Sequence, residues 1–349
     1  MKTYIKFLIN LFNISLLKIF IVFFIIILIT NILEQIEFFK NIDLSFSYLF
    51  FLSLLNTPSV LFEILPFVFL LSTQLFFINL IDKNELQVFK YTGLDNIKII
   101  KILGLYSFIL GIFVVIFFYN GSSILKNSYL LIKNNYSDDN KYLAVITENG
   151  LWIKDEINEN INIINASKVN NEFLLNVSIT RFNKDFNIIE ILQSEKVDIT
   201  SKKWKIFNPI ILKGNSQSSL DELVLQSNFD LQKINGLFSN LSSLSIIDLI
   251  TLRKSYISLN YSVTDINSHL LKIVSYPVYL TLITIFSAII MFNIGYQKNT
   301  FFKITLGIFL SVIIYYINNF LNVLGTNEKI PLSLSIFLPL IILSIINVI

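Results

Sequence analysis

The sequence predicts a polytopic α-helical membrane protein with six transmembrane helices, three on each side of an inserted all-β jelly-roll domain. Three observations lead to this fold class. Charged residues are concentrated in the middle of the chain, where 32 of the 51 lie between Lys126 and Lys272. Long, nearly uncharged segments flank that stretch on both sides. Inside it, the long apolar runs give way to short alternating ones.

Six segments are long and apolar enough to cross a bilayer, because about 20 helical residues span ~30 Å of hydrocarbon. The first contains one charged residue, Lys18, the second contains only Glu63, and the other four contain none. The second segment is too long for one crossing. We therefore expect Leu44–Thr57 to form an interfacial helix and Pro58–Ile81 to form the span. The six segments are Phe7–Leu33, Leu44–Ile81, Ile102–Leu125, Ile273–Gln297, Ile304–Asn327 and Ile330–Ile349.

The lysines in the short flanking segments predict the orientation, because such segments resist translocation. With the N-terminus inside, eight lysines lie on the cytoplasmic side and two, Lys40 and Lys329, in the opposite short loops. This asymmetry places both termini inside and the β domain outside. Residues 1–125 then hold the first three spans, residues 126–268 the β domain with a helical return segment, and residues 269–349 the last three spans.

Composition excludes several function classes. There are no cysteines, so disulfides and cysteine-based metal sites are absent. The net charge is +3, which does not produce the basic surface of a nucleic-acid-binding protein. The single histidine, His269, precedes the fourth span and is interpreted as an interfacial polar residue. No Gly-rich phosphate loop occurs and no cofactor is expected, so any ATP-driven step must be powered by a partner.

The middle domain shows the alternation of short antiparallel strands, separated by Asn, Asp, Ser and Lys. Asn149-Gly150 lies between Tyr142–Thr147 and Leu151–Lys154 and predicts a tight hairpin turn. Ile246–Asn260 is predicted to be helical and to lead back to the fourth span. The other predicted strands are Asn162–Ile164, Phe173–Arg181, Ile188–Leu192, Lys196–Ile199, Trp204–Phe207 and Leu223–Gln226.

The most specific pattern is a spacing of single residues. Pro58 and Pro66 are eight apart, Glu85 lies 19 further on, and Gly93 follows after another eight. In the context Asn84-Glu85-Leu86 and Tyr91-Thr92-Gly93-Leu94, this pattern resembles the lipopolysaccharide export permeases of the LptF/LptG family. The stretch Gly150-Leu151-Trp152-Ile153-Lys154-Asp155 is similar to the G-type member of this family. Further stretches are similar to the family as a whole: Ser194–Val197 with Trp204–Ile206, Tyr276-Pro277, Gly307, Tyr315–Asn319, Pro331 and Pro339.

The resemblance implies a transporter subunit without a catalytic site of its own. A G-type permease would pair with an F-type permease in the bacterial inner membrane, and a dimeric cytoplasmic ATPase would drive the pair. The complex would extract lipopolysaccharide from the membrane. The periplasmic jelly roll would then pass the lipid to single-span and periplasmic bridge proteins that carry it to the outer membrane.

The resemblance also implies that the cytoplasmic segment Asp82–Asn96 contacts the ATPase. We expect a coupling helix over about residues 82–94, with Asp82 and Glu85 near its N-terminal turn, where the helix dipole favours acids. Gly93 would end the helix in the left-handed conformation. Glu85 is the residue expected to anchor in the ATPase. The alternative is an ordinary connecting helix with solvated charges.

At the outer end of the first span, Glu34, Glu37 and Lys40 follow one another at three-residue intervals and are expected to share a helical face. The resemblance implies that this span forms a lateral gate with the fifth span of the partner permease. The resemblance implies that a G-type member would carry Lys at the place of Glu34, which leaves only Lys40 to meet lipid phosphates. The two acids could bind bridging divalent cations, pair with a basic residue of the partner, or be solvated at the membrane surface. The matching gate residues on this chain's own fifth span are Tyr315, Asn318 and Asn319.

Two readings of Glu63 stay open, a place at the outer interface and a role in transport. Two other function classes stay open as well. An ATPase-coupled signalling or mechanotransmission protein would hydrolyse ATP without lipid passage. A membrane-anchored enzyme acting on an external lipid or glycan would use an acidic pair, Asp138-Asp139 or Asp221-Glu222, for acid–base chemistry.

Overall fold

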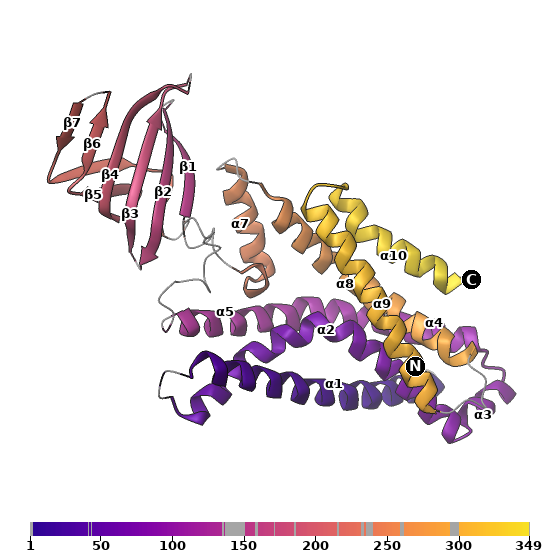
Figure 1. The fold of residues 1–349 in the computed structure, drawn as a ribbon. Coiled ribbons are helices and arrows are strands. Elements are labelled where there is room, and N and C mark those ends of the chain that lie inside the picture. Colours follow the sequence, from indigo (N-terminus) through magenta and orange to yellow (C-terminus); the bar gives the residue numbers. More distant parts are fainter. Residues whose placement is uncertain are drawn as a thin grey trace. The chain divides into compact units, whose positions relative to one another are not determined.

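The structure, a computed structural model, describes residues 3–348 apart from positions 41, 43, 135, 137–150, 158–159, 171, 185, 215, 232–233, 235–239, 259–261 and 294–299. The chain divides into two units. One is helical and combines Met1–Lys126 with Thr264–Ile349, and the other is Asn127–Val263, which contains the strands (Figure 1). The predicted fold class, a polytopic helical membrane protein with an inserted antiparallel β domain, is confirmed.

Within the described residues, five helical runs are long and apolar enough to cross a membrane: α1, α2, α4 with α5, α8 and α9. A π-helical segment, Val114–Tyr119, joins α4 to α5 without a break. The last helix, α10, is apolar but has 17 residues, or about 26 Å of rise, so the sixth span stays a prediction. The helices are α1 (Thr3–Phe38), α2 (Phe46–Asp82), α3 (Glu85–Tyr91), α4 (Asn96–Phe113), α5 (Asn120–Asn134), α7 (Ile246–Ser258), α8 (Thr264–Asn293), α9 (Thr300–Thr326) and α10 (Leu332–Val348).

The predicted break before Pro58 is wrong, because α2 continues through Pro58 and Pro66 as one helix of 37 residues. Its length, roughly 55 Å, exceeds the ~30 Å hydrocarbon layer. A proline removes one backbone hydrogen bond and leaves the carbonyl four residues earlier without its partner. For Pro66 that carbonyl belongs to Phe62, and the Tyr276 hydroxyl of α8 donates to it. A neighbouring helix therefore compensates for the proline, as membrane helices permit.

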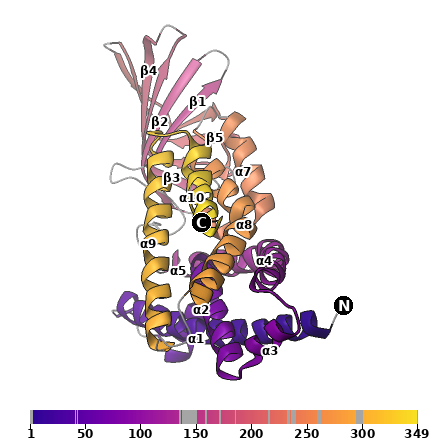
Figure 2. The same ribbon diagram turned by 90° about the vertical axis from the view of Figure 1, so that its right-hand side faces the viewer.

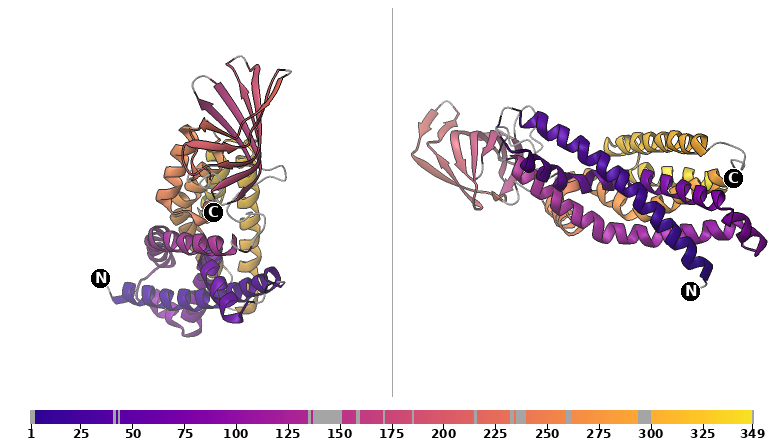
Figure 3. Two further views of the ribbon diagram at one scale, coloured as in Figure 1. Left: turned by 90° about the vertical axis from the view of Figure 1, so that its left-hand side faces the viewer. Right: turned by 90° about the horizontal axis from the view of Figure 1, so that it is seen from below.

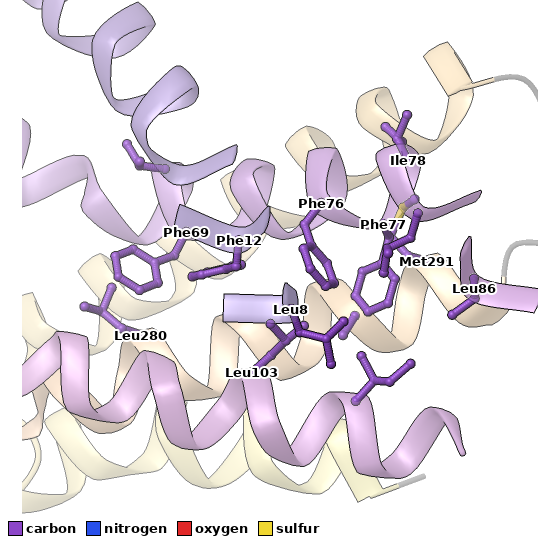
Figure 4. Close-up of a cluster of buried hydrophobic side chains, with 14 of the residues drawn as sticks. Leu8, Phe12, Phe69, Phe76, Phe77, Ile78, Leu86, Leu103, Leu280 and Met291 are labelled. Atoms are coloured by element: carbon purple, nitrogen blue, oxygen red, sulfur yellow. The ribbon is translucent and has the colours of Figure 1, made fainter. Parts of the chain in front are cut away.

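The core of the helical unit is rich in aromatic side chains (Figure 4). Phe12 of α1 meets the rings of Phe69, Phe76 and Tyr106 edge to face, at centroid distances of 6.4, 6.1 and 6.1 Å. Leu103 of α4 lies in the same fully buried cluster, which also includes residues of α8. Edge-to-face pairs add to the energy of simple burial. The N-terminal part of α1 is therefore fixed by its packing.

Helices α8, α9 and α10 lie side by side (Figures 1 and 2). Two glycines allow α9 to approach its neighbours closely. A Cβ at Gly307 would lie within 3 Å of the Gln74 side chain of α2, and one at Gly325 within 3 Å of Ser335 of α10. Small residues at such contacts are typical of helix packing in membranes. The Gly307 contact gives a structural reason for a glycine at that motif position.

The described residues of the β domain form one antiparallel sheet of eight strands. The order β1-β2-β3-β4-β5-β8 is extended by β6 and β7, and β4 pairs with β5 at Lys196–Asp198 and with β6 at Ile191–Gln193. The sheet therefore branches at β4. The strands are β1 (Leu151–Ile157), β2 (Asn160–Asn170), β3 (Phe173–Phe182), β4 (Ile188–Asp198), β5 (Lys203–Phe207), β6 (Ile210–Lys213), β7 (Ser216–Ser219) and β8 (Glu222–Gln226).

The predicted strands correspond to most of this sheet, with two corrections. The predicted strands Ile188–Leu192 and Lys196–Ile199 are parts of a single strand, β4, which ends at Asp198 and whose register with β3 shifts once, between Arg181 and Phe182. The short strands β6 and β7 were not predicted, because four residues are too few for a clear alternation. The helical return segment is confirmed as α7. The predicted hairpin at Asn149-Gly150 lies outside the described residues.

Candidate coupling segment, gate and domain interior

The predicted stop of the cytoplasmic helix at Gly93 is confirmed by its backbone. Gly93 has a φ of +80°, a conformation that costs little only for glycine. Its N–H bonds the carbonyl of Lys90, and the N–H of Leu94 bonds the carbonyl of Phe89 at 2.9 Å. These two bonds form a Schellman motif, which satisfies the last carbonyls of α3. The direction of the chain after α3 is therefore set by Gly93.

The short helix α3 has a buried side and an exposed side. Leu86 and Leu94 are almost fully buried in the core of the helical unit, and Figure 4 shows Leu86 at the end of that cluster. On the other side, Val88 is 59% and Tyr91 88% exposed. These two residues are three positions apart and lie on one face of the helix. This face was not predicted, although an apolar residue and an aromatic one at helical spacing in a polar segment indicate it.

Glu85 lies in the first turn of α3, as predicted. Asp82 does not, because it is the last residue of α2, and Asn84 in the left-handed conformation separates the two helices. One carboxylate oxygen of Glu85 is buried and has no hydrogen-bond partner among the residues that the structure describes. A buried acceptor without a donor is unfavourable.

The residues expected at the gate end of α1 are only partly on one helical face. The helix ends at Phe38, so Glu34 and Glu37 are helical and exposed, whereas Lys40 lies in the turn that follows. The expectation that all three share a helical face is therefore wrong for Lys40. Across the described part of the chain, no three His, Asp or Glu side chains gather to hold a metal ion.

Helices α1 and α9 lie at the periphery of the helical unit, and the right panel of Figure 3 shows indigo α1 along its outside. In the apolar window of each helix, 11% of the residues of α1 and of α9 are buried, against 67% in α2 and 56% in α8. An apolar helix with so few fully buried residues leaves a broad face available to lipid or to another membrane helix.

The predicted gate residues of α9 differ in their surroundings. Tyr315 is half exposed, and its ring lies 5.9 Å from that of Phe67 on α2. Asn318 instead bonds the hydroxyl of Tyr279 on α8, and Asn319 is exposed. The predicted gate residues of α1 and of α9 belong to helices with different main neighbours, since α1 packs chiefly on α2 while α9 packs on α2, α8 and α10.

Charged and polar side chains meet where α2, α5 and α8 approach one another. Glu63 of α2 is exposed and interacts electrostatically with Lys126 of α5 and Lys272 of α8. Beside them, the Tyr119 hydroxyl lies 2.9 Å from Nε2 of His269. Glu63 therefore has cationic neighbours on two other helices, which lowers the cost of an acid in this apolar helix.

The interior of the β domain is apolar, and two motif residues hold it closed. Asp155 is buried and accepts hydrogen bonds from Ser227 Oγ and from the backbone and side-chain nitrogens of Asn228, at 2.8, 3.1 and 2.8 Å. The Trp204 indole donates to the carbonyl of Phe229 at 2.8 Å. Both residues therefore fix the segment after β8. On β3, Ile179 is 1% exposed and belongs to the apolar core, whereas Ser178 faces the other side.

A comparison with protein families matches residues 6–349, essentially the whole chain, to the family described as lipopolysaccharide export system permease LptF/LptG. A search among curated proteins finds no match. The family match covers the helices on both sides of the β domain as well as the domain itself. The chain therefore belongs to the LptF/LptG family of lipopolysaccharide export permeases, which are multi-pass membrane proteins.

Proposed function

We propose that the chain is the G-type permease subunit of an ABC-type complex that extracts lipopolysaccharide from the bacterial inner membrane. Its partners are an F-type permease, a dimeric cytoplasmic ATPase, and single-span and jelly-roll bridge proteins that carry the lipid towards the outer membrane. The observation that carries this proposal is α3, a helix fixed on one side to the bundle and apolar and exposed on the other. Such a face suits the ATPase, which must bind this helix and pass its conformational change on to the membrane helices.

The coupling role rests on the geometry of α3 and its neighbours. Leu86 and Leu94 transmit force because they are buried in the close-packed core of the helical unit. Val88 and Tyr91 supply apolar contact area, and Glu85 supplies an acceptor that lacks a donor within the described chain. A basic or amide side chain of the ATPase completes that bond once the buried carboxylate of Glu85 turns outwards on binding.

The gate is formed by α1 and by the fifth span of the partner permease. This gate is supported by the low burial of α1 and α9. Of the five long apolar helices in the described residues, these two have the smallest share of buried residues. In a pair of related permeases, α1 of this chain would be covered by the fifth span of the partner, and α9 of this chain by the first span of the partner. Lipid phosphates would meet Lys40 at the outer end of α1, and the lysines beside Glu63 add positive charge on the same chain.

The β domain lies in the periplasm and guides acyl chains along its apolar face. Its interior residues are arranged around Ile179, Trp204 and Phe229, which are almost fully buried. Covering an acyl chain with such a surface contributes about 25 cal/mol per Å² of apolar area removed from water. The interior is filled in this structure, so lipid entry requires the segment after β8 to move aside.

The experiment is photo-crosslinking in a reconstituted complex. A photoreactive residue replaces Ile179, which faces the interior, or Ser178 as a matched neighbour on the opposite face. We expect a lipopolysaccharide adduct at Ile179 that needs ATP and the partner permease, and a much weaker one at Ser178. ATP hydrolysis with no adduct at either position or on other strands would reject lipid passage and favour the signalling function.

Glu85→Ala gives a second test at the cytoplasmic side. We expect weaker assembly with the ATPase or lower transport-coupled ATP hydrolysis, with membrane insertion unchanged. Gln87→Ala is a matched control, because Gln87 is exposed on the same helix. Wild-type assembly and transport in Glu85→Ala would make α3 a plain connecting helix.

A further inference from the structure

The outer face of the β domain carries an exposed aromatic ring to which the proposed function gives no role. Trp152 on β1 is 57% exposed, whereas Trp204, the other tryptophan of the chain, is fully buried. Leu151 and Ile153 on either side of Trp152 point into the apolar core, so Trp152 points to the opposite face of the sheet. Because tryptophan is enriched at interfaces, an exposed indole on a strand is a candidate contact for a ligand.

Trp152 begins a row of polar side chains that crosses four strands. In the register of the sheet, Trp152 pairs with Asn165, Asn165 with Ser178, and Ser178 with Gln193. Paired residues of neighbouring strands lie on the same face. Strands β1 to β4 lie side by side in Figure 1. At about 4.8 Å per strand, the row is roughly 14 Å long. It combines one indole with amide and hydroxyl groups.

The row ends at a hollow of about 700 Å³, because Ser178 and Gln193 are among the residues that line it. This volume is in the range of ligand pockets. Asn176 and Asn208 also line the hollow, and their φ values are +48° and +46°. Two left-handed residues make the backbone irregular at this place, in β3 and between β5 and β6. Such conformations cluster at functional sites.

The amide groups of the hollow are available to a ligand. The side chains of Asn176, Gln193 and Asn208 are exposed, and none of them bonds another group within the residues that the structure describes. Each amide has two donors and an acceptor oxygen. A sugar hydroxyl both donates and accepts, so neighbouring hydroxyls of one sugar ring match the two ends of an amide. The C–H groups on the face of a sugar ring pack on the electron-rich face of an indole.

Other classes of ligand fit the hollow less well. The charges of Glu195 and Lys196 are opposite, and the Lys196 ammonium group lies 3.8 Å from the ring centroid of Phe173, so a phosphate would find no cluster of free cations. No three side chains gather to hold a metal ion in the described residues. An extended peptide needs a free strand edge, and β3 and β4 are paired on both sides. A neutral ligand rich in hydroxyl groups fits best.

We infer that the outer face of the β domain binds the sugar portion of lipopolysaccharide. Trp152 stacks on one sugar ring, and the amides of Asn176, Gln193 and Asn208 bond the hydroxyls of its neighbours. The inference rests on the proposed function, which brings lipopolysaccharide to this domain. The sugars cannot follow the acyl chains into the apolar interior, because their hydroxyls would lose their hydrogen bonds there. They stay in water, where the polar outer face meets them.

The sugar contacts are weaker than the burial of acyl chains, because water competes for each hydrogen bond. A photoreactive residue at Ser178 should therefore still capture less lipopolysaccharide than one at Ile179. The two adducts should differ in chemistry, since the sugar portion is attached at Ser178 and an acyl chain at Ile179. Mass spectrometry of the adducts distinguishes them.

The experiment measures binding of the sugar portion alone to the complex of this permease with its partner permease and ATPase. The probe is the oligosaccharide released from lipopolysaccharide by mild acid and labelled with a fluorophore, and fluorescence anisotropy reports its binding. The detergent has no sugar headgroup, so it does not compete. Because the probe has no acyl chains, the apolar interior does not contribute. Intact lipopolysaccharide should displace the probe, and inorganic phosphate should not.

Trp152→Ala should raise the Kd of the probe about 10-fold, because the stacking surface is lost. Trp152→Phe keeps a ring and should raise it less. Gln193→Ala should raise the Kd about 3-fold, the effect of one hydrogen bond. Val224→Ala is the matched control and should bind like wild type, because Val224 is as exposed as Trp152 but lies on β8 and does not line the hollow. If Trp152→Ala does not assemble, Gln193→Ala decides the result.

The sugar site is rejected if the wild-type complex does not bind the probe, if Trp152→Ala binds it like wild type, or if Val224→Ala loses as much affinity. Displacement by inorganic phosphate would show a phosphate site instead. Failure of intact lipopolysaccharide to displace the probe would mean that the sugar comes from another source. Weaker binding of the bridge proteins to Trp152→Ala, with probe binding unchanged, would show a protein contact. Each of these results overturns the inference.

The proposed function is tested separately in the same preparation. Binding of the probe needs neither ATP nor lipid transport. A wild-type complex that hydrolyses ATP and releases no lipopolysaccharide to the bridge proteins would reject the proposed function and leave the binding result unaffected. Release of lipopolysaccharide by a complex that does not bind the probe would reject the sugar site alone.

Discussion

Replacing Tyr91 tests whether the exposed face of α3 is the contact for the ATPase. Tyr91→Ala removes a ring that is 88% exposed in the isolated chain. Burying about 150 Å² of it at 25 cal/mol per Å² gives an upper value of about 4 kcal/mol. Part of this is offset by ordering of the side chain on binding. We therefore expect a loss of about 2 kcal/mol, the size of an interface hot spot.

A loss of that size raises the Kd between the permease pair and the ATPase about 30-fold. The assay is titration of the ATPase onto the permease pair in nanodiscs, with membrane insertion checked in parallel. Tyr91→Phe keeps the ring and should bind within a few-fold of wild type. Ile97→Ala is a matched control, because Ile97 is also exposed but belongs to α4. A Kd for Tyr91→Ala within threefold of wild type would refute the assignment of this face.

Four further predictions concern individual residues and the topology. Gly93→Ala should weaken ATPase binding and coupling, because the φ of +80° strains alanine by about 1 kcal/mol. Gly93→Asn should weaken binding less, and equal losses in the two variants would contradict a requirement for the left-handed backbone conformation. Asp155→Ala should destabilise the β domain by about 3 kcal/mol, because three donors lose their acceptor. Limited proteolysis of the full chain should then show faster cleavage after β8, and an unchanged cleavage rate would contradict the role of Asp155 in fixing that segment. Tyr276→Phe should lower the stability of the helical unit by roughly 0.6–1.7 kcal/mol in detergent unfolding, since it leaves a proline-freed carbonyl without its donor; wild-type unfolding would show that the bond contributes nothing. Reporters fused after Gly214 and after Asn96 should be periplasmic and cytoplasmic, respectively, and the reverse signals would reject the orientation proposed from the lysines.

The sequence alone was sufficient for features that depend on local chemistry. The absence of charge in the long segments predicted membrane helices, because a charge in hydrocarbon is costly wherever the helix packs. Gly93 predicted the end of α3, because only the backbone conformation at that residue is involved. Alternation at Trp204 and Ile206 predicted a strand with one buried face, and both side chains are fully buried.

Only the tertiary structure decided features that depend on a partner far along the chain. Pro58 suggested a break in α2, but nothing local reveals that Tyr276, more than 200 residues later, stabilises this helix at Pro66. In the same way, Asn31 is one polar residue in an apolar run until α2 brings Thr57 to its amide. Local sequence determines which backbone dihedral angles a residue prefers and whether its side chain prefers water or the hydrocarbon of the membrane. Which groups satisfy its hydrogen bonds is determined by the packing of the whole helical unit, because those partners are supplied by other elements.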